Sequence, residues 1–426
     1  MKILYVSGSD LDSGSGKGAF RLHQAFLELG HQSQLLMQRT STDDPTISAY
    51  RVSAPNKALW QGELLAAKAI TSLQRTRDNS PRSLNMFRSG LARRINDSDA
   101  DVVQLHWLGN EAISVAEIGR IRKPLVWRLA DVWPFSGAEH YSLGDDQKRF
   151  KEGYTRRNRQ RTARGFDLDR WVWQRKRRRW KDQAFTVVCG SEWLAECARQ
   201  SALMGSRAVE VIPTSLDTRV FRPVPKKQAR DLLKLPPDKR LLLFGAIRGT
   251  SDQRKGYDLL RGALELFAGT PDARNAEVIV FGSADVRQER DLPLPSRFMG
   301  TLRDDISIVL LYSAADVMIV PSRQEAFGQT ASEALACGTP VVCFDTSGLR
   351  DIVDHKENGY RAQAFEVDDL SNGISWVLNN GPQRLGSAGR QKAEAQFDVL
   401  DQARSYISLY ERLLLEDRFT HEEAQL

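Results

Sequence analysis

The stretch 317–342 reads VMIVPSRQEAFGQTASEALACGTPVV. Its first four residues are typical of a buried strand, Phe327-Gly328 predicts a turn, and a short helix is expected to end at Gly338. Glu325 and Glu333 therefore stand on the loop and the helix that follow one strand. A strand, a loop and a helix in this order form the repeating unit of open α/β folds, which bind ligands at the carboxyl ends of their strands.

The segment between the two glutamates suits an anionic ligand. A helix N-terminus presents free backbone N–H groups and a favourable dipole to phosphate, and here Phe327, Gly328 and Gln329 would supply those groups. Glu333, on the helix, can accept hydrogen bonds from a neighbouring diol. A diphosphate that joins two sugars fits this layout.

This segment resembles the E-x7-E motif of the retaining, nucleotide-sugar-dependent glycosyltransferases of family 4, which have the GT-B fold. The flanking Pro-Ser and Gly-Thr-Pro also match, and the resemblance covers most of the chain. It implies an α/β protein of two Rossmann-like domains, each with a doubly wound parallel sheet, that face a central cleft. It also implies that Glu325 orients the donor sugar, that Glu333 holds the ribose diol, and that transfer retains the anomeric configuration.

The order of predicted elements along the 426 residues agrees with two domains. Strands and helices alternate through 1–218, although 55–96 reads as helical throughout, and the pattern restarts after a proline-marked crossing. We expect 1–218 to be the acceptor-side domain and 219–394 the nucleotide-sugar-binding domain. The resemblance implies that the last helix, at about 395–420, crosses back onto the N-terminal domain.

Composition limits the class of protein. No stretch approaches 18 consecutive apolar residues, and the N-terminus reads as a short strand and not as a signal peptide. The four cysteines lie in apolar contexts without metal-ligand spacing, which indicates buried thiols in a reducing cytoplasm. The strings Asp10-Leu-Asp12 and Asp167-Leu-Asp169 lack the surroundings of a metal site, so we expect no metal and no cofactor.

A basic motif follows the first strand of the predicted C-terminal domain. Lys255 precedes Gly256 at a strand-to-helix turn, from which a lysine can reach a phosphate. In the resembled family a Lys-Gly pair at this place, with an arginine a few residues earlier, holds the donor diphosphate. Arg248 and Arg254 are both candidates for that arginine.

A glycine-rich stretch follows the first N-terminal strand. Gly14-Ser-Gly16-Lys17-Gly18 does not match a P-loop, because Leu11 stands where the first glycine is required and no Ser or Thr follows the lysine. It resembles the family's N-terminal glycine loop, which implies that Gly14, Gly16 and Lys17 contact the donor.

The stretch 127–141 reads WRLADVWPFSGAEHY and looks like a segment of polysaccharide-assembling members, including colanic-acid and exopolysaccharide transferases. The histidine that those members carry near the donor sugar is replaced here by Ala130. Its role therefore cannot be transferred to this position. The candidates that would compensate on the sugar or acceptor side are His106, Arg128, Asp131 and His140.

Positive charge is concentrated in one region of the chain. The net charge is +7, and 148–181 contains fifteen Lys or Arg but three acidic residues, interleaved with Trp171, Trp173 and Trp180. A solvated helix face, an anionic membrane surface and nucleic acid are the three interpretations. The membrane is favoured over nucleic acid, because the resembled family often uses lipid diphosphate acceptors.

These patterns, together with the family resemblance, imply a cytoplasmic transferase, peripheral on the inner face of the plasma membrane through 148–181. It would move a sugar from a nucleotide sugar to a glycan or polyprenyl-diphosphate-linked acceptor in cell-surface polysaccharide biosynthesis. Three alternatives remain: a catalytically weakened homologue that acts as a binding subunit, suggested by Ala130; a nucleic-acid-binding protein, suggested by 148–181; and a sugar-nucleotide epimerase, which fits the E-x7-E segment less well.

Overall fold

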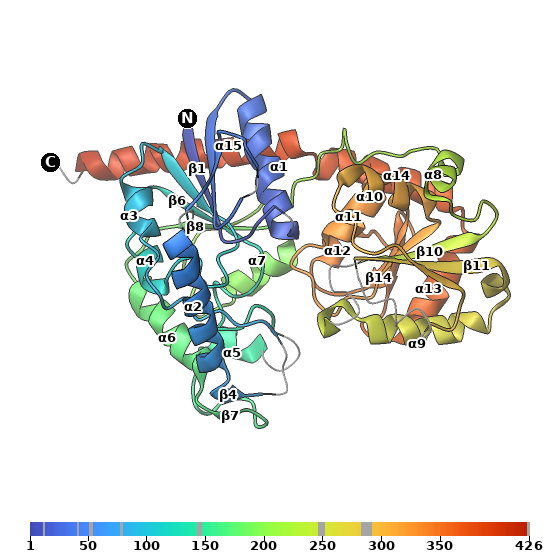
Figure 1. Ribbon diagram of the computed structural model, residues 1–426, viewed down its shortest axis with the longest axis horizontal. Helices are drawn as coiled ribbons and strands as arrows, with labels where there is room; N and C mark the ends of the chain where they lie inside the picture. Colours follow the sequence, from blue (N-terminus) through green and yellow to red (C-terminus); the bar gives the residue numbers. More distant parts are fainter. Residues whose placement is uncertain are drawn as a thin grey trace. The chain divides into compact units, whose positions relative to one another are not determined.

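The computed structural model describes residues 1–11, 13–40, 42–50, 54–76, 80–142, 147–245, 252–282 and 292–423. The chain forms two compact units (Figure 1). Unit 1 comprises Met1–Pro213 and Leu400–Leu426, and unit 2 comprises Thr214–Val399. Each unit is built around one parallel sheet, as the alternating pattern predicts.

The sheet of unit 1 has seven strands in the order β3-β2-β1-β5-β6-β8-β9, and all neighbouring pairs are parallel. Most of these strands are short apolar runs that helices and loops bury on both faces, as is usual for parallel sheets. Their bounds are β1 Lys2–Ser7, β2 Gln32–Met37, β3 Ile47–Ala49, β5 Val102–Leu105, β6 Leu125–Leu129, β8 Thr186–Cys189 and β9 Val209–Val211.

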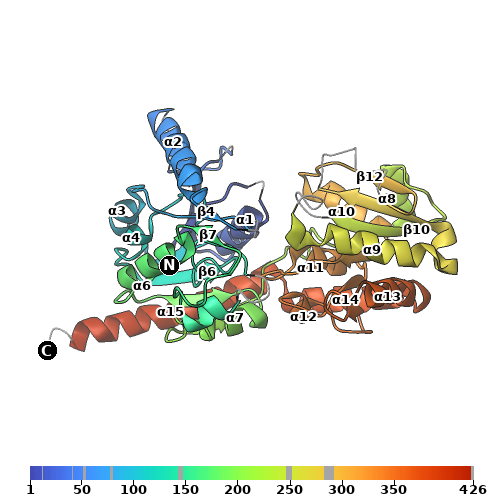
Figure 2. The same cartoon turned by 90° about the horizontal axis from the view of Figure 1, so that it is seen from below.

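The helices of unit 1 are α1 Gly14–Glu28, α2 Ala54–Thr71, α3 Leu91–Asn96, α4 Val115–Ile118, α5 Gln147–Glu152, α6 Leu168–Arg179 and α7 Glu192–Arg199. The expectation of helix throughout 55–96 is wrong, because α2 ends at Thr71 and strand β4, Gln74–Arg75, follows it. This strand pairs with β7, Arg164–Gly165, in a two-stranded antiparallel ribbon. Figures 1 and 2 show α2 extending away from the sheet, and Figure 1 draws the ribbon at its far end.

The last helix, α15, covers Val399–Glu423, and from Leu400 onward it belongs to unit 1. It packs there through two buried tyrosines, Tyr406 and Tyr410, whose rings lie 6.5 and 5.9 Å from the ring of Phe26 on α1. The Tyr410 hydroxyl also donates to Gln104 of β5 and lies 3.5 Å from the Tyr5 hydroxyl of β1. The C-terminal helix thus completes the core of the N-terminal unit.

The sheet of unit 2 has six parallel strands in the order β12-β11-β10-β13-β14-β15. The chain builds the sheet outward from β10 in one direction and from β13 in the other, so the topological switch point lies between these two neighbours. The bounds are β10 Arg240–Gly245, β11 Ala276–Phe281, β12 Ser296–Phe298, β13 Val317–Val320, β14 Val341–Phe344 and β15 Gly359–Ala362.

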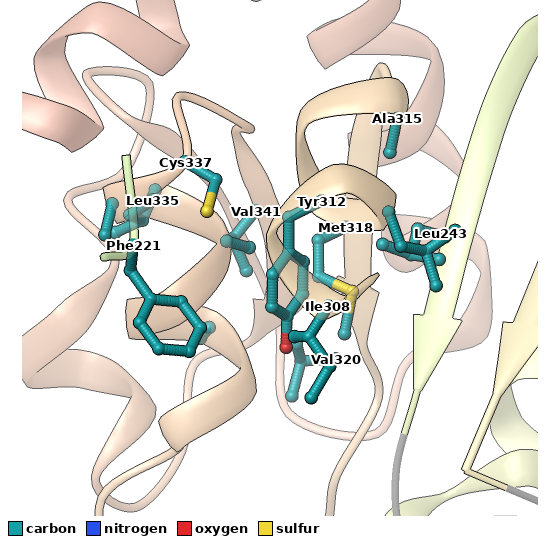
Figure 3. Close-up of a cluster of buried hydrophobic side chains, with 14 of the residues drawn as sticks. Phe221, Leu243, Ile308, Tyr312, Ala315, Met318, Val320, Leu335, Cys337 and Val341 are labelled. Carbon is teal, nitrogen blue, oxygen red and sulfur yellow. The ribbon is translucent and has the colours of Figure 1, made fainter. Parts of the chain in front are cut away.

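Two apolar clusters cover the faces of this second sheet. Helices α8, α10, α11 and α14 lie on one face, and α9 and α13 lie on the other (Figure 1). Figure 3 shows part of the first cluster, where the ring of Tyr312 lies among Met318, Val320 and Val341. The helix bounds are α8 Lys226–Leu233, α9 Tyr257–Ala268, α10 Asp305–Ala314, α11 Gln329–Ala336, α12 Leu349–Ile352, α13 Val367–Asn379 and α14 Pro382–Gln396, with 3-10 turns at Gln253–Lys255 and Pro271–Asn275.

All four cysteines are buried free thiols, as the sequence predicts. Among the helices in the described ranges, none combines the length and the apolar character that crossing a bilayer requires.

Candidate functional site

Two loops meet at the switch point of unit 2. The Lys255-Gly256 turn precedes α9, and the 321–328 loop follows β13. Gly256 has φ of +69°, and a Cβ there would lie 2.0 Å from the carbonyl oxygen of Pro321. The Arg323 amide donates to the Arg254 carbonyl oxygen at 2.8 Å. Only glycine permits this approach, which brings the basic turn and the first glutamate together.

Glu325 accepts hydrogen bonds from three side chains. Lys255 Nζ donates to Oε1 at 2.6 Å, Ser322 Oγ donates to the same oxygen at 2.8 Å, and Arg254 donates to Oε2 at 3.3 Å. The side chains of Lys255, Arg254 and Glu325 are 17%, 13% and 11% exposed, so the ion pairs are shielded but reachable from solvent. Asp252 accepts a further bond from Arg254 at 3.1 Å.

The charges of this cluster set its protonation. Burial acts to raise the pKa of Glu325, but the Lys255 and Arg254 cations outweigh burial and hold this pKa at about 2. Burial also lowers the pKa of Lys255, against the opposing effect of the Glu325 charge. The site therefore carries a carboxylate and two cations.

The backbone of Glu325 is held on both sides by the segment after β14. Its amide donates to Ser347 Oγ at 3.0 Å, and its carbonyl oxygen accepts from the Gly348 amide at 3.0 Å. Ser347 is buried and has φ of +49°, a conformation that residues other than glycine rarely adopt. The two hydrogen bonds hold the backbone of Glu325 in place. No sequence motif points to Ser347, and Ser322 stands out in the sequence only through the Pro-Ser pair.

The predicted turn and helix N-terminus are present after Glu325. The side chain of Phe327 is buried against Phe397, with ring centroids 5.4 Å apart. Only the backbone of Phe327 is therefore expected to contact a ligand. Gly328 has φ of +120°, and a Cβ there would lie 2.8 Å from Leu349 Cδ2. Gly328 is the N-cap of α11 and brings no side-chain cap, which leaves the N-terminus that begins at Gln329 suited to an anion.

Glu333 lies on α11 and is half-buried. Tyr312 of α10 donates to its Oε2 at 3.2 Å. This tyrosine, which the sequence pattern indicates only as part of a buried helix, orients the second carboxylate. Of the two arginines proposed beside Lys255, Arg254 is in the cluster, whereas Arg248 lies outside the described residues.

The glycine-rich stretch of unit 1 is not a loop but the first turn of α1. Ser13 caps the helix by accepting from the Gly16 amide at 3.1 Å. A Cβ at Gly16 would lie 1.7 Å from the Asp10 carbonyl oxygen, so this glycine is required by the packing of the helix start. Gly14 and Lys17 belong to the same turn, and their role toward a donor stays a prediction.

The four candidates of the sugar side are all buried in unit 1. Asp131 accepts from Trp107 Nε1 at 2.7 Å and lies 2.6 Å from His140 Nδ1, while His140 Nε2 lies 2.7 Å from Ser83 Oγ. His140 also stacks on Trp133. These contacts hold the 131–140 segment together. The other two candidates form a second pair.

His106 lies at the carboxyl end of β5, 3.4 Å from Arg128 of β6. Burial and the Arg128 charge hold the pKa of His106 well below its usual value, so the ring is neutral. Its Nδ1 has no hydrogen-bond partner within the described part of the chain. The contacts given above for these four residues lie within unit 1, and a direct role toward a sugar stays a prediction.

The basic region 148–181 is not one surface. Trp173 and Trp180 are core residues, so the expectation that the tryptophans mark a membrane interface is wrong for both. Lys176 is fully buried: its Nζ donates to the carbonyl oxygens of Trp133, Ser136 and Gly137 and lies 3.7 Å from the centre of the Trp133 ring.

Two arginines of the same region are also internal. Arg149 pairs with Asp167 at 2.9 Å, and Arg175 donates to the carbonyl oxygens of Leu84 and Asn85 at 3.0 and 3.2 Å. The alternation of basic and aromatic residues therefore arises partly from core packing. The basic residues that remain exposed are Lys148, Lys151, Arg156, Arg157, Arg161, Arg164, Arg177, Arg178, Arg179 and Lys181.

Comparison with known proteins agrees with the geometry of unit 2. Residues 227–392 match the family model described as Glycosyl transferases group 1. D-inositol 3-phosphate glycosyltransferase 2 of Catenulispora acidiphila is 31% identical over 219 residues, which cover 48% of this chain and 50% of that protein. The corresponding enzyme of Mycolicibacterium smegmatis is 31% identical over 222 residues, with coverage of 50% and 49%. The chain thus spans about half the length of the curated relatives it matches.

Solved structures resemble nearly the whole chain. Sucrose-phosphate synthase from Thermosynechococcus elongatus has a TM-score of 0.68 at 19% identity and covers 98% of this chain and 100% of its own. HepE of Anabaena in complex with UDP and glucose has a TM-score of 0.64 at 16% identity, with coverage of 97% and 100%. At such identities the likeness concerns the fold. The two parallel-sheet units therefore have the fold of GT-B glycosyltransferases, and residues 227–392 of unit 2 match the glycosyl transferases group 1 family.

Proposed function

We propose that this protein transfers a sugar from a nucleotide diphosphate sugar to an acceptor. The observation that carries the proposal is the cluster of Lys255, Arg254 and Glu325 at the switch point of a domain that matches the glycosyl transferases group 1 family. Ligands bind at switch points in open α/β sheets, and two shielded cations beside an uncapped helix N-terminus suit a diphosphate.

The residues of unit 2 divide the proposed work among them. Lys255 and Arg254 neutralise the charge that develops on the diphosphate as it leaves, an effect that is strong in a shielded site. Backbone N–H groups at Phe327–Gln329 bind phosphate or sugar hydroxyls, and Glu325 orients the sugar. Glu333, which is oriented by a hydrogen bond from Tyr312, accepts hydrogen bonds from the ribose diol. Because two cations already face the diphosphate, we propose that transfer needs no metal. Retention of the anomeric configuration is proposed from the sequence resemblance alone.

The acceptor has two candidate classes. The relatives named above are D-inositol 3-phosphate glycosyltransferases, which favours a phosphorylated polyol. The alternative is a lipid-linked glycan of cell-surface polysaccharide biosynthesis, which the sequence resemblance implies. A surface on unit 1 favours the second class, because it combines exposed apolar and basic side chains.

This surface, called here the tip, is formed by Leu73, Arg75, Arg161, Arg164 and Phe166. The two apolar members are 57% and 53% exposed, and the Phe166 amide donates to the Leu73 carbonyl oxygen at 3.1 Å, so they lie side by side. The three arginines are exposed, and two of them belong to the β4–β7 ribbon. Exposed apolar groups with cations beside them suit an anionic bilayer, so we propose that the protein binds membranes peripherally through the tip.

Sedimentation with liposomes tests the tip. A Leu73→Ser, Phe166→Ser double variant should lose most binding to vesicles with anionic lipid, and Arg161→Gln with Arg164→Gln should weaken it by about 1 kcal/mol per charge. Leu232→Ser, on an equally exposed leucine of unit 2, is the matched control and should bind as wild type does. Binding by both double variants equal to that of wild type, or release of the protein by double-stranded DNA at physiological salt, would contradict the membrane proposal.

Calorimetric titration with UDP-, GDP- and ADP-sugars, followed by product analysis with both acceptor classes, tests the activity itself. We expect one nucleotide to bind and its sugar to appear on an acceptor with unchanged anomeric configuration. Binding without transfer or hydrolysis would favour a binding subunit, the alternative that Ala130 suggests. Absence of binding to any nucleotide sugar would refute the proposed function.

A further inference from the structure

The cations proposed to receive the diphosphate already have an anionic partner. Both bond the same carboxylate: Lys255 Nζ lies 2.6 Å from Glu325 Oε1, and Arg254 Nη1 lies 3.3 Å from Oε2. Arg254 has a second carboxylate, Asp252, at 3.1 Å. Lys255 is therefore the cation on which Glu325 acts most directly, and a diphosphate approaching it meets a carboxylate at hydrogen-bond distance.

We infer that Glu325 and the diphosphate compete for Lys255 and Arg254, and that diphosphate binding releases the Glu325 carboxylate to receive the sugar hydroxyls. This inference rests on the proposed function and concerns the order of events at the same site. In the absence of a diphosphate the carboxylate is engaged by the two cations. Once the phosphate oxygens take these cations, Glu325 Oε1 keeps one protein donor among those described above, Ser322, and gains accepting capacity for the sugar.

The surroundings of Glu325 make such an exchange feasible without movement of the loop. Ser347 and Gly348 bond its amide and its carbonyl oxygen, so the backbone keeps its place when the side chain changes partners. Ser322 lies three residues before it on the same loop and remains within reach of Oε1 at 2.8 Å. The exchange therefore requires local movement of the Glu325, Lys255 and Arg254 side chains and not of the loop backbone.

The exchange also gives the site selectivity. A free sugar meets a carboxylate that is already satisfied by two cations, whereas a nucleotide sugar brings the diphosphate that frees this carboxylate. Since such coupling is reciprocal, binding of the sugar hydroxyls to Glu325 should in turn increase the affinity of the site for the diphosphate. Glu325 thus lowers the affinity for a diphosphate that carries no sugar.

Inorganic pyrophosphate is the probe, because it presents the diphosphate without base or sugar. Titration calorimetry should find that Glu325→Gln binds pyrophosphate roughly tenfold to a hundredfold more tightly than wild type, the range for freeing hydrogen bonds of charged groups. Asp258→Asn makes the same change of charge on a neighbouring acid whose partner is Arg323, at 2.6 Å, and should bind as wild type does. Equal or weaker binding by Glu325→Gln would overturn the inference, as would an equal gain in Asp258→Asn.

Glu325→Asp provides a second variant if the Glu325→Gln protein does not fold. It keeps the charge but shortens its reach, so pyrophosphate affinity should rise by a smaller factor. An affinity at or below that of wild type would overturn the inference. Failure of the proposed function has a different signature: wild type, Glu325→Gln and Glu325→Asp would all fail to bind pyrophosphate and nucleotide sugars alike.

Discussion

Substitution of Gly256 by alanine tests whether the turn and the loop meet as closely as the site requires. Two costs are expected. The first is the left-handed backbone at φ of +69°, which costs a residue with a Cβ about 1–2 kcal/mol. The second is steric, because the new Cβ would lie 2.0 Å from the Pro321 carbonyl oxygen. Overpacking of this kind typically destabilises a protein by about 1–3 kcal/mol, because neighbouring groups must shift to make room.

The total loss should be roughly 2–5 kcal/mol, which for a unit of this size lowers the melting temperature by roughly 4–20 °C. Gly300→Ala is the matched control: its φ is +68°, but its Cβ would meet nothing within 4 Å, so it carries the backbone cost alone. Differential scanning calorimetry on the whole chain measures both variants. The clash also displaces Pro321 and the Glu325 loop that follows it, so Gly256→Ala should lose affinity for pyrophosphate while Gly300→Ala should not. Equal melting temperatures for the two variants, with unchanged binding, would refute the close approach.

Three further outcomes follow from the site and from the core of unit 1. Lys255→Ala should lose most turnover, more than Arg254→Ala loses, because it removes positive charge where the leaving diphosphate is proposed to form; steady-state kinetics that rank the two variants in the opposite order would contradict this. Glu333→Gln should weaken binding of the nucleotide sugar by about 1–3 kcal/mol, and calorimetry that finds unchanged affinity in the folded variant would exclude the diol role. Burial, together with the charge of Asp169, raises the pKa of Glu139 from 4.5 to about 8. The folded state therefore binds this proton more tightly than the unfolded chain does, and the free energy of unfolding falls as the pH rises from about 4.5 to about 8. Glu139→Gln should therefore gain in melting temperature relative to wild type between pH 5 and about 8.5, and parallel pH profiles would show that this carboxyl is not protonated in the fold.

The fold is predictable from the sequence because the strands are short apolar runs with helices between them. Periodicity alone therefore locates most of the strands of both sheets. The stretch 55–96 has no clear period, which is why the expectation of a continuous helix there is wrong. The β4–β7 ribbon joins segments about 90 residues apart, and no local pattern records such a pairing.

The candidate site is predictable to the extent that its residues lie within short motifs. Glu325, Lys255 and Arg254 all stand in such motifs, and they are in contact. Ser347 escapes prediction, because its position after β14 brings it to Glu325 only in three dimensions. The environment of Lys176 is also not predictable from the sequence. A run of basic residues is normally exposed to solvent, yet the Lys176 ammonium group is buried and donates hydrogen bonds to three carbonyl oxygens in the core.

The discontinuity of unit 1 has a consequence for how the chain folds as it is made. Tyr5 and Phe26 emerge early from the ribosome, but the helix that covers them, with Tyr406 and Tyr410, follows the 186 residues of Thr214–Val399. At synthesis rates of about 5–20 residues per second, roughly 10–40 s pass before this helix is available. During that interval unit 2 can complete its own sheet, whereas Met1–Pro213, which is synthesised before unit 2, exposes an aromatic surface to chaperones and to other chains. Of the two units, unit 1 therefore completes its fold after unit 2, although most of unit 1 is synthesised before unit 2.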